Sequence, residues 1–200
     1  MVTLNSDLDI LNFTLQLQYV ETAFYKAVLA SNLLTGVELD YAQTFSRHQE
    51  EHEAGLKQLI ARLGGAPGPA LPAYNLPPFK TREDAIRLLV SSEDAGVAAA
   101  LGLVPLYQSK DLMETAINAH NVEAEHAAVW RDIAGLPAAP DTVAKGLTVD
   151  EIAATAAQFL QPPASAAPAA PPAPTGTSPV FQPTPPPGPR PGFVRRLGDG

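Results

Sequence analysis

Four segments of the chain place their apolar residues at steps of three and four, which is the spacing of one face of an α-helix. They span residues 8–29, 42–63, 86–104 and 112–133. A fifth, shorter segment with the same spacing spans 148–160. No segment alternates apolar and polar residues as a half-buried strand does. The sequence therefore predicts an all-α protein: an antiparallel four-helix bundle with a short fifth helix packed on its outside or its end.

Local signals predict where the helices begin and end. Asp7 is suited to cap the first helix, and Gly36 lies beyond its end. The pair Gly64-Gly65 ends the second helix, and the third is expected to open at Thr81. The proline-rich connection 66–80 is long enough to cross the length of a bundle. A long crossover is therefore expected between the second and third helices.

The distribution of proline divides the chain near residue 160. Of 21 prolines, 13 lie in residues 161–200, where the other residues are mostly Ala, Gly, Thr and Ser. A segment of this composition lacks the apolar side chains for a core and is expected to be disordered. The chain is therefore predicted to have one folded domain, residues 1–160, and a disordered proline-rich tail, residues 161–200.

Charge and cysteine content exclude several classes of partner. The formal net charge is −8, and the tail contributes +2, so the folded domain carries −10. A nucleic-acid partner is not expected, because phosphate binding needs an excess of Lys and Arg. The chain has no cysteine, which excludes disulfides and thiolate metal sites. No stretch was expected to span a membrane, and a soluble, cytoplasmic protein is predicted.

Polar side chains interrupt each long apolar stripe near its middle, where buried polar groups need partners. They are Gln18 in the first stripe, Gln49 and His52 in the second, Glu93 in the third, and Glu123 and His126 in the fourth. The spacing from 18 to 49 to 52 is 31 and then 3, and the spacing from 93 to 123 to 126 is 30 and then 3. This repetition indicates an internal duplication of a helix pair.

The same pattern occurs in di-iron carboxylate bundles, where two helices each supply one Glu and the other two each supply Glu-x-x-His. Segments 9–25 and 121–131 resemble the bacterial ferritin-like domain family, which includes proteins described as desiccation-related. The resemblance covers about residues 7–160 and excludes the tail. It implies a ferritin-like bundle whose metal site is lined by the six polar positions: Gln18, Gln49, His52, Glu93, Glu123 and His126.

Two of these positions depart from the family pattern, because Gln18 and Gln49 stand where the metal site would have Glu. The remaining carboxylates, Glu93 and Glu123, neutralise one divalent ion rather than two. The sequence therefore predicts a degenerate centre that binds at most one ion of iron, zinc or manganese, with a role in metal handling or stress protection. Glu21 and Glu53 lie one turn from the glutamines and would replace the missing carboxylates only if the site shifted along the bundle.

Two other functions stay open at this stage: a metal-free structural or adaptor bundle acting through its tail, and an active di-iron ferroxidase or oxidase. The end of the tail, residues 192–200, is apolar and basic and resembles a docking peptide of ferritin-like proteins captured in protein shells. A homo-oligomer is compatible with the sequence. His120 is expected to line the polar core, whereas His48 and Tyr25 are interpreted as ordinary surface or core residues.

Overall fold

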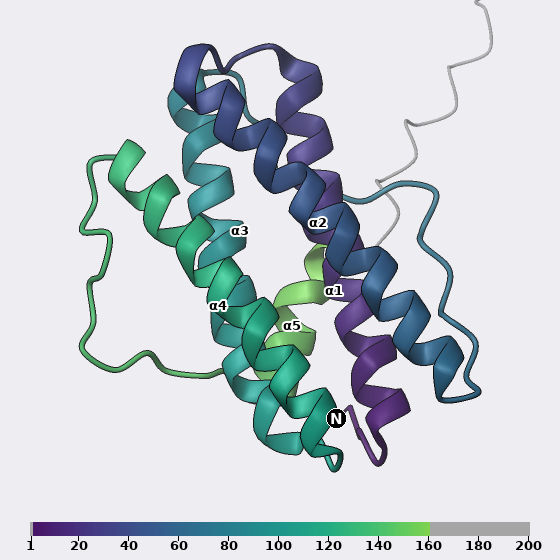
Figure 1. The fold of residues 1–200 in the computed structure, drawn as a ribbon. Helices are drawn as coiled ribbons and strands as arrows, with labels where there is room; N and C mark the ends of the chain where they lie inside the picture. The colour runs from purple at the N-terminus through teal and green to yellow at the C-terminus, as the bar shows by residue number, and fades with distance from the viewer. Residues whose placement is uncertain (1, 161–200) are drawn as a thin grey trace, which may run out of the picture. The chain divides into compact units, whose positions relative to one another are not determined.

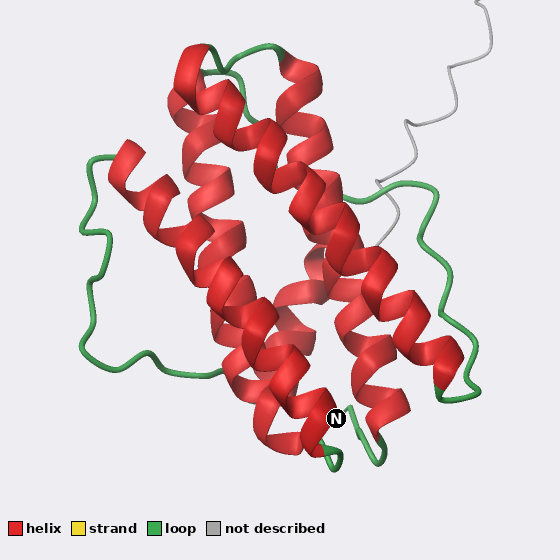
Figure 2. Cartoon of the chain, viewed as in Figure 1, coloured by secondary structure: helices red, strands yellow, loops and turns green. Residues whose placement is uncertain are grey.

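The computed structural model describes residues 2–160, which form five α-helices and one short 3-10 turn, with no strand among them (Figures 1 and 2). The elements are α1 (Asp7–Ser31), α2 (Gly36–Arg62), α3 (Arg82–Leu103), η1 (Val104–Leu106), α4 (Lys110–Ile133) and α5 (Val149–Leu160). The predicted all-α bundle is confirmed. The predictions for the tail concern residues that lie outside the described part of the chain.

The four long helices form two antiparallel pairs, α1 with α2 and α3 with α4, and the pairs meet mainly through α1 and α3 (Figure 1). Helices α2 and α3 run in the same direction, so the connection between them has to return along the bundle. Its backbone is held against α1, because the Gly68 N–H donates to Asn12 Oδ1 at 2.8 Å and the Tyr19 hydroxyl donates to the Gly68 carbonyl at 3.0 Å. The crossover is therefore an ordered part of the fold.

Side-chain caps define the helix starts, and one of them differs from the sequence prediction. Ser6, not Asp7, caps α1, and it forms a reciprocal capping box with Asp9. Asp7 instead accepts hydrogen bonds from the backbone N–H groups of Gln108 and Ser109, at 2.7 and 3.1 Å, and so ties the start of α1 to the start of α4. Thr81 caps α3 with a second capping box, as its position predicted.

The apolar spacing also predicted the start of α2 too late, at residue 42. Gly36, expected to lie in the loop after the first helix, is the first residue of α2. The preceding helix already ends at Ser31, and Asn32 adopts the left-handed conformation, φ 57°, that often follows a helix. The error has a physical reason: the first turn of α2 carries few buried side chains, so the apolar stripe begins only at Ala42.

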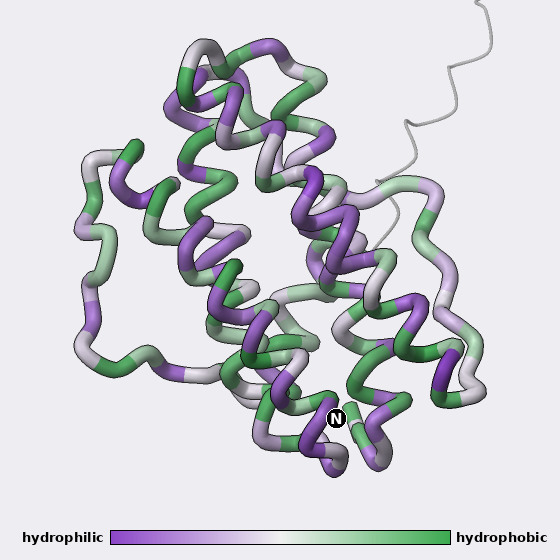
Figure 3. The backbone as a smooth tube through the Cα atoms, in the orientation of Figure 1, coloured by the Kyte–Doolittle hydropathy of each residue, from purple (hydrophilic) through white to green (hydrophobic). Residues whose placement is uncertain are grey.

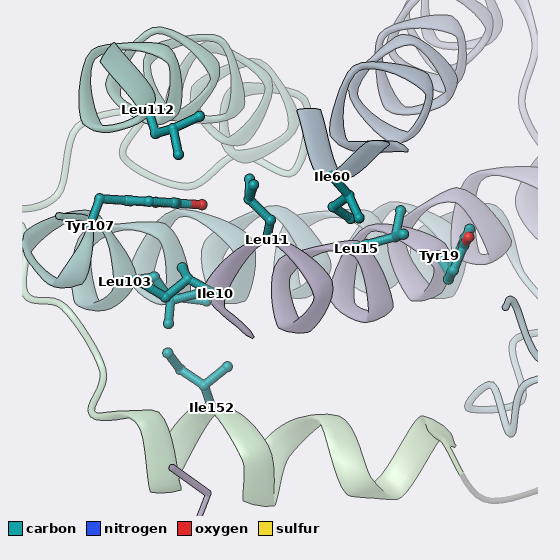
Figure 4. Packing of buried hydrophobic residues seen from close by; sticks show 10 residues of the cluster. Ile10, Leu11, Leu15, Tyr19, Ile60, Leu103, Tyr107, Leu112 and Ile152 are labelled. Carbon is teal, nitrogen blue, oxygen red and sulfur yellow. The ribbon is translucent and has the colours of Figure 1, made fainter. Parts of the chain in front are cut away.

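Helix α5 packs against α1 and α3, as expected for a helix on the outside of the bundle. Ile152 points from α5 toward Ile10 and Leu103 in one apolar cluster (Figure 4). The loop before α5 crosses α3 in very close contact at Gly102, where an added Cβ would lie 1.8 Å from the Leu147 carbonyl oxygen. Only glycine permits this crossing, which positions α5.

The buried apolar residues form two clusters at different heights in the bundle. One contains Leu15, Ile60 and Leu112 among its members, and the other contains Val28, Leu89 and Trp130. On every long helix the polar positions found in the sequence lie between residues of the two clusters. Figure 3 shows the resulting mixture of hydrophilic and hydrophobic positions along each helix. The fold thus places one polar layer between two apolar cores.

The sequence analysis predicted that no segment is long and apolar enough to span a membrane, and this was wrong for one segment. The segment Arg82–Leu106 is long and apolar enough to cross a membrane by length and composition, and a third of its most apolar window is buried inside the described structure. Apolar core helices pass the same test. In the bundle, α3 contacts α1, α4 and α5.

Candidate metal centre

All four long helices contribute a side chain to the polar layer at mid-bundle. Gln49 is completely buried, Glu93 and His126 are each 1% exposed, and Gln18 and Glu123 are each 6% exposed. His52 is the most accessible member, with a side chain that is 20% exposed. The structure therefore brings together all six positions selected from the sequence. It does not bring in Glu53, which pairs with Lys57 instead.

Three ligand atoms in this layer lie close together without forming hydrogen bonds to one another. His126 Nδ1 lies 3.6 Å from Glu93 Oε2 and 3.5 Å from Glu123 Oε2, which is too long for a hydrogen bond. Neither His126 Nδ1 nor Glu93 Oε2 has another hydrogen-bond partner. Ligand atoms around one four-coordinate divalent ion lie about 3–3.5 Å apart. Glu93, Glu123 and His126 thus have the spacing of a metal site, and the ligand atoms of Glu93 and His126 are unpaired.

His52 adds a fourth candidate ligand to this group. Its Nδ1 atom lies 2.7 Å from Glu123 Oε1 but lacks the alignment of a hydrogen bond and has no other partner. In both Glu-x-x-His-like pairs, therefore, the Nδ1 nitrogen faces the carboxylates. Two imidazoles and two carboxylates form a donor set suited to iron, manganese or zinc.

The two glutamines form a hydrogen-bond chain that leads to the carboxylates. The Gln18 amide donates to the Gln49 side-chain oxygen. Gln49 Nε2 donates in turn to Glu123 Oε2 at 3.0 Å and lies 3.4 Å from Glu93 Oε1. The glutamines therefore neutralise no charge, and of the two Gln49 alone donates hydrogen bonds to the carboxylates while Gln18 holds Gln49 in place. This is the physical consequence of replacing Glu at these two positions.

Burial and neighbouring charges shift the protonation of the centre in opposite directions. Burial raises the pKa of Glu93 to about 8, although the nearby His126 opposes the shift. Burial alone would lower the pKa of His126, but the Glu123 and Glu93 carboxylates outweigh it and raise the pKa to about 9. Burial would raise the pKa of Glu123, but contacts with His126 and His52 hold this pKa well below its usual range.

At pH 7 and without metal, the directions of these shifts favour a neutral arrangement of Glu93, Glu123 and His126. Glu93 is then protonated, Glu123 is negative, and His126 is positive. A divalent ion bound by two carboxylates also gives a neutral centre, because the ion's two charges replace the two protons.

Two functional contacts were missed in the sequence. His48 Nδ1 lies 2.9 Å from His126 Nε2, so the ring nitrogen of His126 that faces away from the carboxylates has a partner that orients it. The Tyr25 hydroxyl donates to Glu93 and accepts from Trp130 Nε1 at 2.8 Å. His48 lies one turn before His52, and Tyr25 lies two turns after Gln18; these helical spacings were the available signal.

The fold and the layer define a ferritin-like protein. Residues 6–136 match the family model of the ferritin-like domain, and the chain therefore belongs to this family. Among solved structures, the crystal structure of a conserved hypothetical protein from Mycobacterium tuberculosis is similar, with a TM-score of 0.58 and 21% identity. The match covers 62% of this chain and 93% of that chain, and at this identity it shows the fold alone. No curated protein was found to match the chain.

Proposed function

We propose that this chain binds one divalent transition-metal ion, iron, manganese or zinc, through His52, Glu93, Glu123 and His126. The observation that supports the proposal most strongly is that three buried ligand atoms of this group, His52 Nδ1, Glu93 Oε2 and His126 Nδ1, have no hydrogen-bond partner. Buried polar atoms are almost always paired, and an unpaired set on three helices calls for a ligand. Bound there, a divalent ion would supply Lewis acidity and, if it is iron, one-electron redox chemistry.

The charge of the centre sets the number of ions. Glu93 and Glu123 neutralise one divalent ion, whereas a second ion would leave an excess of +2 in a buried layer, at a cost of several kcal/mol. The protein is therefore proposed to act in metal handling or stress protection as a carrier of one ion rather than as a di-iron ferroxidase.

Elemental analysis of protein purified without chelator tests this proposal. We expect about one ion per chain, and none in the Glu123→Ala variant, which removes the carboxylate that lies near both histidines. Glu125→Ala is the matched control, because Glu125 is on the same helix and exposed. Its metal content is expected to equal that of the natural chain.

Two results would contradict the proposal. Absence of metal, even after titration with Mn²⁺, Zn²⁺ and Fe²⁺ in turn, would favour a metal-free structural or adaptor bundle. Two tightly bound ions, lost together in Glu123→Ala, would favour a di-iron oxidase and show that glutamine does not disable the centre.

A further inference from the structure

A cavity of about 740 Å³ lies inside the bundle beside the polar layer. All five α-helices contribute to its wall, and most of the side chains that face it are apolar, including Leu17, Leu56 and Leu103. Its size is within the range of small-molecule sites, roughly 300–1,000 Å³. A large apolar cavity is a poor environment for water and a good one for apolar ligands.

The cavity is elongated along the bundle axis. Its wall includes residues of α1 from Leu11 to Phe24, and thirteen steps of about 1.5 Å along a helix correspond to about 20 Å. Exposed polar residues such as Glu51, Thr115 and Gln158 also belong to the wall, so the cavity reaches the surface. The shape therefore suits a chain-like molecule that enters from solvent.

The polar groups that face the inner part of the cavity carry negative charge or offer neutral hydrogen bonds. Glu21 lies against Gly96 and forms no hydrogen bond or ion pair with any described residue. Burial and the charges of Glu123 and Glu93 raise its pKa well above the usual range. His120 also lines the cavity, and its buried Nδ1 atom has no partner.

These groups select the chemistry of the ligand. The ionised Glu123 carboxylate, which also lines the cavity, would repel an anionic head group, and an apolar cavity disfavours any charged one. A hydroxyl or carbonyl oxygen, in contrast, pairs with a protonated carboxyl or an imidazole without carrying charge. We infer that the cavity binds an uncharged, chain-like apolar molecule with one hydroxyl or carbonyl oxygen placed toward Glu21 and His120.

The test measures binding to the full chain in the presence of a metal chelator, so that its outcome is independent of metal binding. The three probes have the same ten-carbon chain and differ in charge: 1-decanol, decanoate and decyltrimethylammonium. We expect saturable binding of about one molecule of 1-decanol per chain in ligand-observed NMR titrations. Both charged probes are expected to bind at least about tenfold more weakly, because burial of a charge is costly.

Variants on one helix locate the binding site. Ala119 and Ala124 are both half-buried on α4, but only Ala119 lines the cavity. Ala119→Phe is expected to weaken 1-decanol binding at least about tenfold, and Ala124→Phe no more than about twofold. If circular dichroism shows that Ala119→Phe does not fold, Ala116→Leu provides a smaller obstruction in the same wall. Glu21→Gln keeps an uncharged hydrogen-bonding group at this position and is expected to change 1-decanol binding no more than about twofold.

The inference is overturned if 1-decanol shows no saturable binding, including the case in which another part of the chain already fills the cavity. It is also overturned if either charged probe binds as tightly, or if both phenylalanine variants have the same effect. If the natural chain binds 1-decanol but no metal, the proposed function is refuted and the inference about the cavity stands.

Discussion

Restoring carboxylates at both glutamine positions is the sharpest test of the charge argument. In the Gln18→Glu, Gln49→Glu variant, four carboxyl groups would share a layer in which Gln49 is completely buried and Gln18 nearly so. The substitution also removes the Gln49 amide donor, which lies 3.0 Å from Glu123 Oε2 and 3.4 Å from Glu93 Oε1. Without metal, the two histidines are the only residues of the layer that could carry a positive charge, against four carboxyl groups.

The magnitude follows from the cost of keeping the new groups neutral. A free Glu has a pKa of about 4.3, and each pH unit corresponds to about 1.4 kcal/mol, so a Glu that stays protonated at pH 7 costs about 4 kcal/mol. A new Glu would stay ionised at pH 7 only if its ionised form cost less free energy than its protonated form. The metal-free variant with two new Glu residues is therefore expected to lose up to about 8 kcal/mol, against a typical total of about 5–15 kcal/mol.

Chemical denaturation with chelator, and again with excess Mn²⁺ or Zn²⁺, measures this loss. Two ions would neutralise four carboxylates, so metal is expected to restore stability and the bound ratio to rise from about one to about two. Gln43→Glu with Gln58→Glu is the matched control, because both residues are exposed on α2 and the added charge is the same. A metal-free variant as stable as the natural chain, with no gain of a second ion, would refute the reasoning.

Three further predictions concern protonation, a buried hydrogen-bond chain and a close backbone crossing. Because the pKa of Glu93 is raised to about 8 and that of His126 to about 9, both hold protons at pH 7 in the metal-free chain. Metal affinity is therefore expected to rise with pH up to about 9, with about two protons released per bound ion at pH 7. Calorimetry in buffers of different ionisation enthalpy measures the number of protons released. Metal binding without proton release would contradict the prediction. Tyr25→Phe leaves Trp130 Nε1 and Glu93 without their hydrogen-bond partner, so it should lower the free energy of unfolding by about 1–3 kcal/mol. Tyr41→Phe is the control, because Tyr41 is exposed, and it should change the free energy of unfolding little. Urea melts measure both effects. Gly102→Ala would place a Cβ against the Leu147 carbonyl, so it should lower the free energy of unfolding by about 1–3 kcal/mol in urea melts and speed hydrogen exchange in α5. At Gly55 an added Cβ meets no atom within 4 Å, so Gly55→Ala should stabilise the protein by about 0.5–1 kcal/mol. Equal effects of the two variants would show that the crossing at Gly102 is not tight.

The number of helices, their approximate lengths and the residues of the polar layer were all accessible from the sequence. Apolar spacing reports which side of a helix is buried, and the repeated interval between Gln18, Gln49 and His52 and their counterparts identified the residues that would meet. These features depend on local periodicity, which a linear chain displays directly. Helix ends were less certain, because Ser6 and Asp7 are both good caps and only the surrounding hydrogen bonds distinguish them.

Contacts between residues distant in sequence were decided by the tertiary structure alone. The pairing of His48 with His126, and of Tyr25 with Glu93 and Trp130, depends on the rotation and height of four helices relative to one another. The cavity depends on the separation of the helices and on the position of α5, which Gly102 permits through its close contact with Leu147. Periodicity specifies a buried face but not the distance to the face opposite, and that distance determines whether a layer is packed or hollow.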